Sequence, residues 1–179
     1  MIESIIAAIR PLDSAAMQSA RKRQDALTKP TGSLGRLEDL SIQLAGITRQ
    51  CPPSIPQRKA VLVFAGDHGV TAQGVSAYPS AVTCQMVLNF LAGGAAINVL
   101  ARQANARVII VDAGVSGDLP ATPNLISGKI DRGTADMSTG PAMTADQARE
   151  ALELGARVAQ AEIATGLDLL ACGEMGIGN

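Results

Sequence analysis

Lys59-Ala-Val-Leu-Val-Phe-Ala-Gly66 is the segment from which the fold can be predicted, and Asp67-His68-Gly69 follows it at once. A short, continuous apolar run that ends in glycine is typical of a strand buried on both faces of a parallel sheet. Residues 107–112 (Arg-Val-Ile-Ile-Val-Asp) and 168–173 (Asp-Leu-Leu-Ala-Cys-Gly) have the same form. The sequence therefore predicts three strands, each followed by a glycine-containing turn.

Helical patterns separate these strands. Residues 80–103 are predicted to be helical, with Ser80 as the N-cap and a break or close packing contact at Gly93-Gly94. A second helix should begin at the Thr144–Gln147 capping box and end near Gly166. Residues 116–143 are rich in turn signals and carry no predicted element. Strands that alternate with helices indicate an α/β fold of three layers, Rossmann-like, with a mostly parallel sheet.

The first 58 residues differ from the rest of the chain. They carry helical patterns over residues 13–28, capped by Asp13 or Ser14, and again from Arg36. We therefore expect a small helical region over residues 1–58 and an α/β core domain over residues 59–179. A three-strand parallel sheet that ends on its own glycine loop is short for this fold, so we expect the core to be truncated at its C-terminal end.

Composition excludes several classes of protein. The 179 residues are 47% hydrophobic, and 15 Lys and Arg face 16 Asp and Glu, which argues against disorder and against a nucleic-acid partner. No run reaches the roughly 18 apolar residues of a membrane span, and no signal peptide is recognisable. A single histidine rules out a multi-histidine metal site, and three distant cysteines fit a reducing cytoplasm. We expect a cytoplasmic protein with no metal.

Polar and glycine residues follow each predicted strand, at the edge where parallel α/β folds bind ligands. Asp67 and His68 could form a polar pair at a pocket mouth, or Asp67 could simply bond the backbone of a turn. Gly176 and Gly178 could let backbone N–H groups approach a phosphate, or could form a tight turn. Glu174 would face ribose hydroxyls or a cationic ring more readily than a phosphate; alternatively, it complements a helix dipole. From the residues alone, the reaction stays open.

The helix from residue 80 begins after a segment that could contact an aromatic ligand. Tyr78 could line such a pocket, although a lone tyrosine is more often a packing residue. Met86 and Phe90 lie four residues apart, which is most simply a core stripe.

Five segments together resemble one known family in order and spacing. They are Leu27-Thr-Lys-Pro-Thr-Gly-Ser-Leu-Gly-Arg-Leu-Glu38, Phe64-Ala-Gly-Asp-His-Gly-Val70, Tyr78-Pro-Ser-Ala-Val-Thr83, Asn89-Phe-Leu-Ala-Gly-Gly-Ala-Ala-Ile-Asn98 and Gly173-Glu-Met-Gly-Ile-Gly-Asn179. The chain resembles the N-terminal half of the nicotinate-nucleotide–dimethylbenzimidazole phosphoribosyltransferases, whose members are substantially longer.

This resemblance implies a homodimeric, cofactor-free transferase of cobalamin biosynthesis. It would convert nicotinate mononucleotide and 5,6-dimethylbenzimidazole into α-ribazole 5′-phosphate and nicotinate. Glu174 matches a glutamate near the reacting ribose. The other residues implied in substrate binding are Gly176, Gly178 and Asn179 for the phosphate, Tyr78, Ser80 and Met86 for the benzimidazole, and Asp67 and His68.

The same resemblance places the general base in the family's C-terminal half. We therefore expect these 179 residues alone to have no transferase activity. Two alternatives remain open: a nucleotide-binding module without turnover, and a ribosyl hydrolase that uses Asp67 as its polar group.

Overall fold

The computed structural model describes residues 1–179 and shows helices and parallel strands in alternation over most of the chain. The elements in chain order are α1 (Ile2–Ala8), α2 (Ser14–Ala26), α3 (Arg36–Thr48), β1 (Lys59–Gly66), the 3₁₀ helix η1 (Gly69–Gln73), α4 (Ala81–Leu91), α5 (Ala96–Gln103), β2 (Ala106–Gly114), β3 (Leu125–Ser127), α6 (Ala145–Ala164) and β4 (Leu169–Met175).

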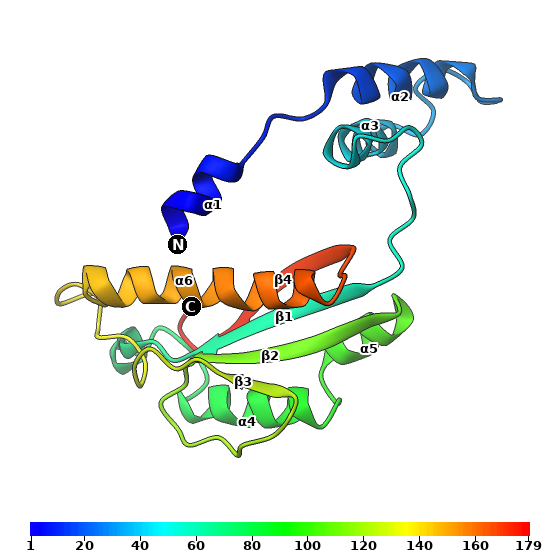
Figure 1. The fold of residues 1–179 in the computed structure, drawn as a ribbon. Helices are drawn as coiled ribbons and strands as arrows, with labels where there is room; N and C mark the ends of the chain where they lie inside the picture. Colours follow the sequence, from blue (N-terminus) through cyan, green and yellow to red (C-terminus); the bar gives the residue numbers. More distant parts are fainter. The chain divides into compact units, whose positions relative to one another are not determined.

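The four strands form one parallel sheet in the order β3-β2-β1-β4. The chain first adds β2 and β3 on one side of β1 and then returns to place β4 on the other side. Helix α6 covers one face of the sheet, while α4 and α5 cover the opposite face (Figure 1). The predicted three-layer α/β fold is therefore confirmed.

Alternate residues of β1 explain why both faces of the sheet are buried. Val63 and Ala65 pack in the cluster that contains Val87 and Phe90 of α4. Leu62 points to the other side and packs with Leu154 and Val158 of α6. An apolar residue at every position is what a strand needs when helices cover both faces.

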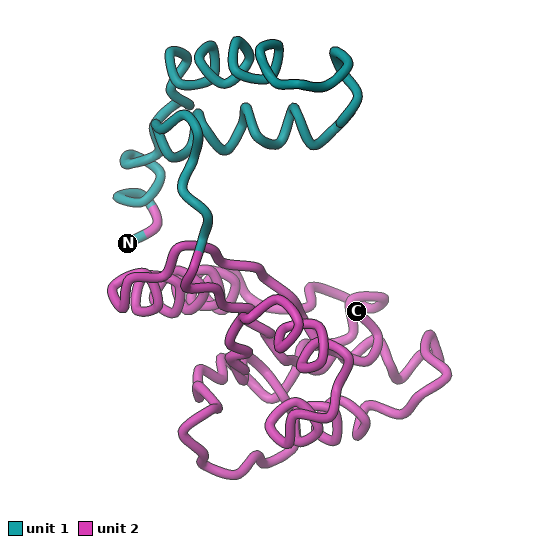
Figure 2. The backbone as a smooth tube through the Cα atoms, turned by 90° about the vertical axis from the view of Figure 1, so that its right-hand side faces the viewer, with its two compact units in different colours: residues 1, 3–56 teal, residues 2, 57–179 magenta.

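The chain divides into two compact units, residues 1 and 3–56, and residues 2 and 57–179 (Figure 2). In the first unit, α2 and α3 pack through small side chains, with Ala16, Ala20 and Ala45 at the contact. The Asp13 side chain accepts a hydrogen bond from the Ala16 N–H at 2.8 Å, so the predicted cap of α2 is confirmed.

Three local predictions need correction. Ser80 precedes α4 but makes no side-chain cap, because its hydroxyl donates elsewhere. Residues 116–143 contain a short strand, β3, that the sequence did not predict. The predicted strand over 168–173 extends to Met175 and lies at a sheet edge, so most of its side chains are exposed rather than buried.

The expectation that no segment could span a membrane is also wrong by length and composition. Residues 81–103 are long enough and apolar enough to cross a membrane. They form two helices, α4 and α5, separated by a turn in which Gly93 has a φ of +78°. Helix α4 buries Val87 and Phe90 against the sheet, as a core helix does.

Candidate functional site

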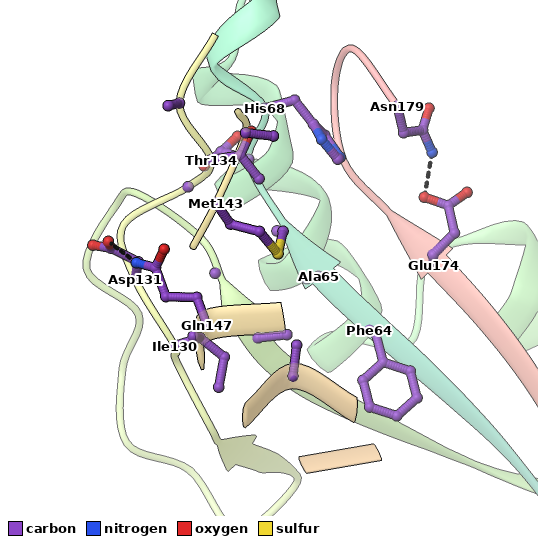
Figure 3. Close-up of a pocket in the computed structure, with 18 of the residues that line it drawn as sticks. Phe64, Ala65, His68, Ile130, Asp131, Thr134, Met143, Gln147, Glu174 and Asn179 are labelled. Atoms are coloured by element: carbon purple, nitrogen blue, oxygen red, sulfur yellow. Dashed lines mark hydrogen bonds between the residues drawn. The ribbon is translucent and has the colours of Figure 1, made fainter. Parts of the chain in front are cut away.

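A cavity of about 920 Å³ opens in the second unit, at the carboxyl ends of β1, β2 and β4 (Figure 3). In a sheet of this order, β1 and β4 flank the point where the winding direction changes, which is the usual ligand position of open α/β folds. The lining is mainly apolar and includes Phe64, Ala65, Ala113, Ile130, Pro141, Met143 and Met175. Its polar groups include Asp67, His68, Asp131, Gln147, Glu174 and Asn179.

Asp67 lies at the end of β1 and is 5% exposed. One carboxylate oxygen accepts from the Ser80 hydroxyl at 2.9 Å. The other accepts from the N–H and the hydroxyl of Ser116, at 2.8 and 2.7 Å. Asp67 thus joins the end of β1 to the turn after β2 and to the first residue before α4.

These bonds decide the protonation state of Asp67. Burial raises the pKa of its carboxyl, but hydrogen bonds from Ser116, Thr83 and Ser80 together outweigh burial and hold the pKa below its usual range. Asp67 is therefore an anion at neutral pH whose acceptor sites serve the protein itself. This arrangement disfavours the alternative of a ribosyl hydrolase that uses Asp67 as its polar group, because the acceptor atoms of Asp67 are already engaged within the protein.

Two basic side chains, Lys129 and Arg132, stabilise the turn after β2 that donates hydrogen bonds to Asp67. Lys129 contacts the Val115 carbonyl, donates to the Gly117 carbonyl at 3.0 Å, and pairs with the buried Asp112 carboxylate at 3.3 Å. Arg132 donates to the Ser116 carbonyl at 2.7 Å. The loop after β3 thereby fixes the turn after β2.

The glycine loop after β4 is anchored by α4. The Ile177 N–H donates to the Thr83 hydroxyl at 3.0 Å, and the Asn179 N–H donates to the Gly176 carbonyl at 3.2 Å. Gly178 has a φ of +90°, a conformation that favours glycine. Two of the loop's N–H groups are thus used within the protein.

Close packing explains why residue 176 is glycine. A side chain there would collide with the Gly66 carbonyl and would lie 2.7 Å from Nε2 of His68. The His68 imidazole therefore lies against the glycine loop and also lines the cavity. The structure brings His68, Gly176 and Glu174 to the same edge of the sheet.

Glu174 and Asn179 form a pair on the cavity wall. The Asn179 side-chain amide donates to a Glu174 carboxylate oxygen, and Figure 3 shows both side chains on the same side of the cavity. Glu174 is exposed and sits opposite Phe64 in the β1–β4 register. Its carboxylate is held in orientation while remaining open to a ligand.

Three residues implied for the benzimidazole lie outside this cavity. Tyr78 is 66% exposed, and Met86 packs against the core cluster beneath α4. The Ser80 hydroxyl is committed to Asp67. Gly176 and Gly178 also do not line the cavity, although Asn179 does.

Sequence reasoning missed the far wall of the cavity, which residues 130–147 supply. The Gln147 side chain donates to Asp131 at 2.7 Å, and the Gly69 N–H donates to the Thr134 hydroxyl at 3.2 Å. Met143 and Ala65 both line this cavity (Figure 3). The Thr144 capping box, which the sequence did predict and which is present, was the one signal that a helix begins at this wall.

Cation binding has little support at this edge. No group of three or more His, Cys, Asp and Glu side chains gathers in the chain. The partners of Asp67 are hydroxyl and N–H donors, which satisfy a carboxylate without a metal.

The fold and the cavity define a Rossmann-like α/β protein whose ligand site lies at the change in winding direction. A family model described as phosphoribosyltransferase matches residues 9–179, and the chain belongs to this phosphoribosyltransferase family. The resemblance predicted from the sequence is therefore confirmed.

Similar proteins cover the whole chain. A nicotinate-nucleotide–dimethylbenzimidazole phosphoribosyltransferase from Chloroflexus aurantiacus is 58% identical over 179 residues, which are 100% of this chain and 51% of that protein. The enzyme of the same name from Desulforudis audaxviator is 52% identical, over 100% of this chain and 50% of its own length. A crystal structure of the Thermus thermophilus enzyme of that name matches with a TM-score of 0.90 and 50% identity, over 94% of this chain and 51% of that one. The chain thus spans about half the length of the relatives it matches.

Proposed function

We propose that this chain carries part of the substrate site of a phosphoribosyltransferase that uses nicotinate mononucleotide and 5,6-dimethylbenzimidazole. Identity of 58% to an enzyme with that name, over the whole chain, carries the proposal. The position of Glu174 and Asn179 on a cavity at the carboxyl edge of the sheet supports it. The product would be α-ribazole 5′-phosphate, a precursor of the lower ligand of cobalamin.

The chemistry needs few groups from this part of the protein. Nicotinate leaves from a positively charged pyridinium, so no acid has to protonate it. A carboxylate near the ribosyl carbon stabilises the positive charge that develops there. Glu174 has the required exposure, and the bond from Asn179 fixes its orientation in advance.

The phosphate would bind at the glycine loop. Glycines carry no side chain that would keep an anion away from backbone N–H groups, and the loop reaches the cavity through Asn179. Ile177 and Asn179 already donate within the protein, which leaves the N–H groups of the two glycines as the proposed phosphate donors.

Further parts of the proposal come from the family resemblance. They are a homodimeric assembly, a cytoplasmic location and no cofactor. The proton of the benzimidazole would be removed by a base outside these 179 residues. Sedimentation of the purified protein measures directly whether it forms a homodimer.

Calorimetry and a product assay test the proposal. We expect the chain to bind nicotinate mononucleotide, Glu174→Gln to weaken that binding, and the exposed control Glu150→Gln on α6 to leave it unchanged. We expect no α-ribazole phosphate from the 179-residue chain alone. Product formation at a rate near that of a full-length relative would contradict this expectation.

The same assay separates the alternatives. Nicotinate release that does not depend on dimethylbenzimidazole would indicate a ribosyl hydrolase. Binding of nicotinate mononucleotide without turnover, even when the purified C-terminal half of a relative is added, would indicate a nucleotide-binding module.

A further inference from the structure

Thr83 occupies an unusual place for a polar side chain. It lies in the first turn of α4 and is 0% exposed. Its hydroxyl accepts the Ile177 N–H at 3.0 Å, a contact between residues 94 positions apart in the chain. The Thr83 hydroxyl also helps to lower the pKa of the Asp67 carboxyl.

We infer that Thr83 is a positioning residue that holds the glycine loop 176–178 in place relative to the end of β1. The anchoring role does not depend on the proposed function. Only its consequence does, which is that the anchored loop binds the phosphate of the nucleotide. The loop's own residues cannot supply the anchor, because two of the three are glycines.

A hydroxyl is the group that this position needs. Asp67 accepts from the Ser80 hydroxyl and from both donors of Ser116, and as a carboxylate it can only accept. When the Thr83 hydroxyl donates to that carboxylate, its oxygen lone pairs are left for the Ile177 N–H. Thr83 thus connects an acceptor at the end of β1 to a donor in the loop after β4.

This inference gives the Tyr78–Thr83 segment a role different from a ligand contact. Ser80 and Thr83 both lie at the start of α4 and both help to lower the pKa of Asp67, and the Ser80 hydroxyl donates to the Asp67 carboxylate at 2.9 Å. Only Thr83 also contacts the glycine loop. Ser80→Ala is therefore a matched control, because it disturbs Asp67 without removing a contact to the glycine loop.

The test is the hydrogen-exchange rate of the Ile177 amide, followed by NMR in the 179-residue chain. In the parent chain this amide should be protected although it lies in a loop. Thr83→Val keeps the shape and removes the hydroxyl, and should raise the Ile177 rate about tenfold, as expected for one lost buried hydrogen bond. In Thr83→Ser and in Ser80→Ala, the exchange rate of the Ile177 amide should stay within about twofold of the parent rate.

Rates are compared with those of β1 amides, which report global unfolding, so a merely destabilised variant does not mimic the effect. An unprotected Ile177 amide in the parent chain would overturn the inference, and this measurement needs no variant. So would equal rates in Thr83→Val and Ser80→Ala.

Binding of nicotinate mononucleotide then separates the two proposals. If the parent chain binds, Thr83→Val should weaken binding about tenfold, and Thr83→Ser should not. If the parent chain does not bind, the proposed function fails, while the exchange rates still decide the role of Thr83.

Discussion

Replacing Asp67 by Asn tests whether this carboxylate organises the site. Three hydrogen bonds of 2.7–2.9 Å end on the charged group. An amide oxygen can keep the two Ser116 donors at neutral strength, so each bond loses about 1 kcal/mol. A neutral amide is less costly to bury, which leaves a net loss of about 2 kcal/mol in the free energy of unfolding.

The pH dependence of that loss makes the prediction specific. The folded-state pKa of Asp67 lies below its unfolded value, so its stabilisation is complete above the unfolded pKa of about 4. It disappears as the pH falls through the folded pKa. The stability difference between the parent chain and Asp67→Asn should therefore be largest at neutral pH and shrink below about pH 4.

Urea unfolding at a series of pH values measures this difference. Other carboxyls whose pKa is lowered, such as Asp136 and Asp168, are present in both proteins and cancel in the comparison. Ser80→Ala removes one of the three bonds and should lose about a third as much stability. A difference that stays constant from pH 7 to about pH 3 would refute the role of the charge.

Other substitutions test the loops around the site. Lys129→Met leaves the buried Asp112 carboxylate without its cation, and should cost about 2–4 kcal/mol in urea unfolding at neutral pH. Gly176→Ala forces a Cβ against the His68 ring, and should cost about 2 kcal/mol and weaken nucleotide binding measured by calorimetry. Gly155→Ala lies in α6 with no neighbour within 4 Å of the new Cβ, and should stabilise by about 0.5–1 kcal/mol. Equal stability changes for the two glycine variants would contradict this account of the loop.

Much of the fold could be predicted from local patterns. The run 59–66 has no polar residue after Lys59, and both faces of β1 are indeed buried. The capping residues Asp13 and Thr144 each make the predicted bond to a free N–H. These signals depend on residues within one turn or one strand, so no tertiary information is needed to interpret them.

The cavity wall over residues 130–147 could not be predicted for the opposite reason. Its backbone is held by distant partners: Thr134 donates from its N–H to the Asp67 carbonyl at 3.0 Å, and Ile130 to the Ala113 carbonyl at 3.0 Å. β3 has three residues, which is too short for any periodicity to be recognised. Hydrogen bonds to remote strands leave no local pattern in the sequence, and in this wall only the Thr144–Gln147 capping box gave one.

The polar residues near the end of β1 show where sequence reasoning about a site reaches its limit. Asp67 was a candidate for ligand contact because it follows a strand, and Ser80 because of the family resemblance; the structure joins the two by a hydrogen bond at the ligand edge. The hydrogen bonds of Asp67 and Ser80 are made within the protein, whereas the exposed Glu174 and Asn179 leave polar atoms open to the cavity. A buried carboxylate that accepts three hydrogen bonds and has a lowered pKa does not readily take a substrate proton, so its contribution to the site is rigidity. The proposed function therefore places the chemistry of this chain on Glu174 at the end of β4, while Thr83 and the residues around Asp67 hold the neighbouring loops in one conformation.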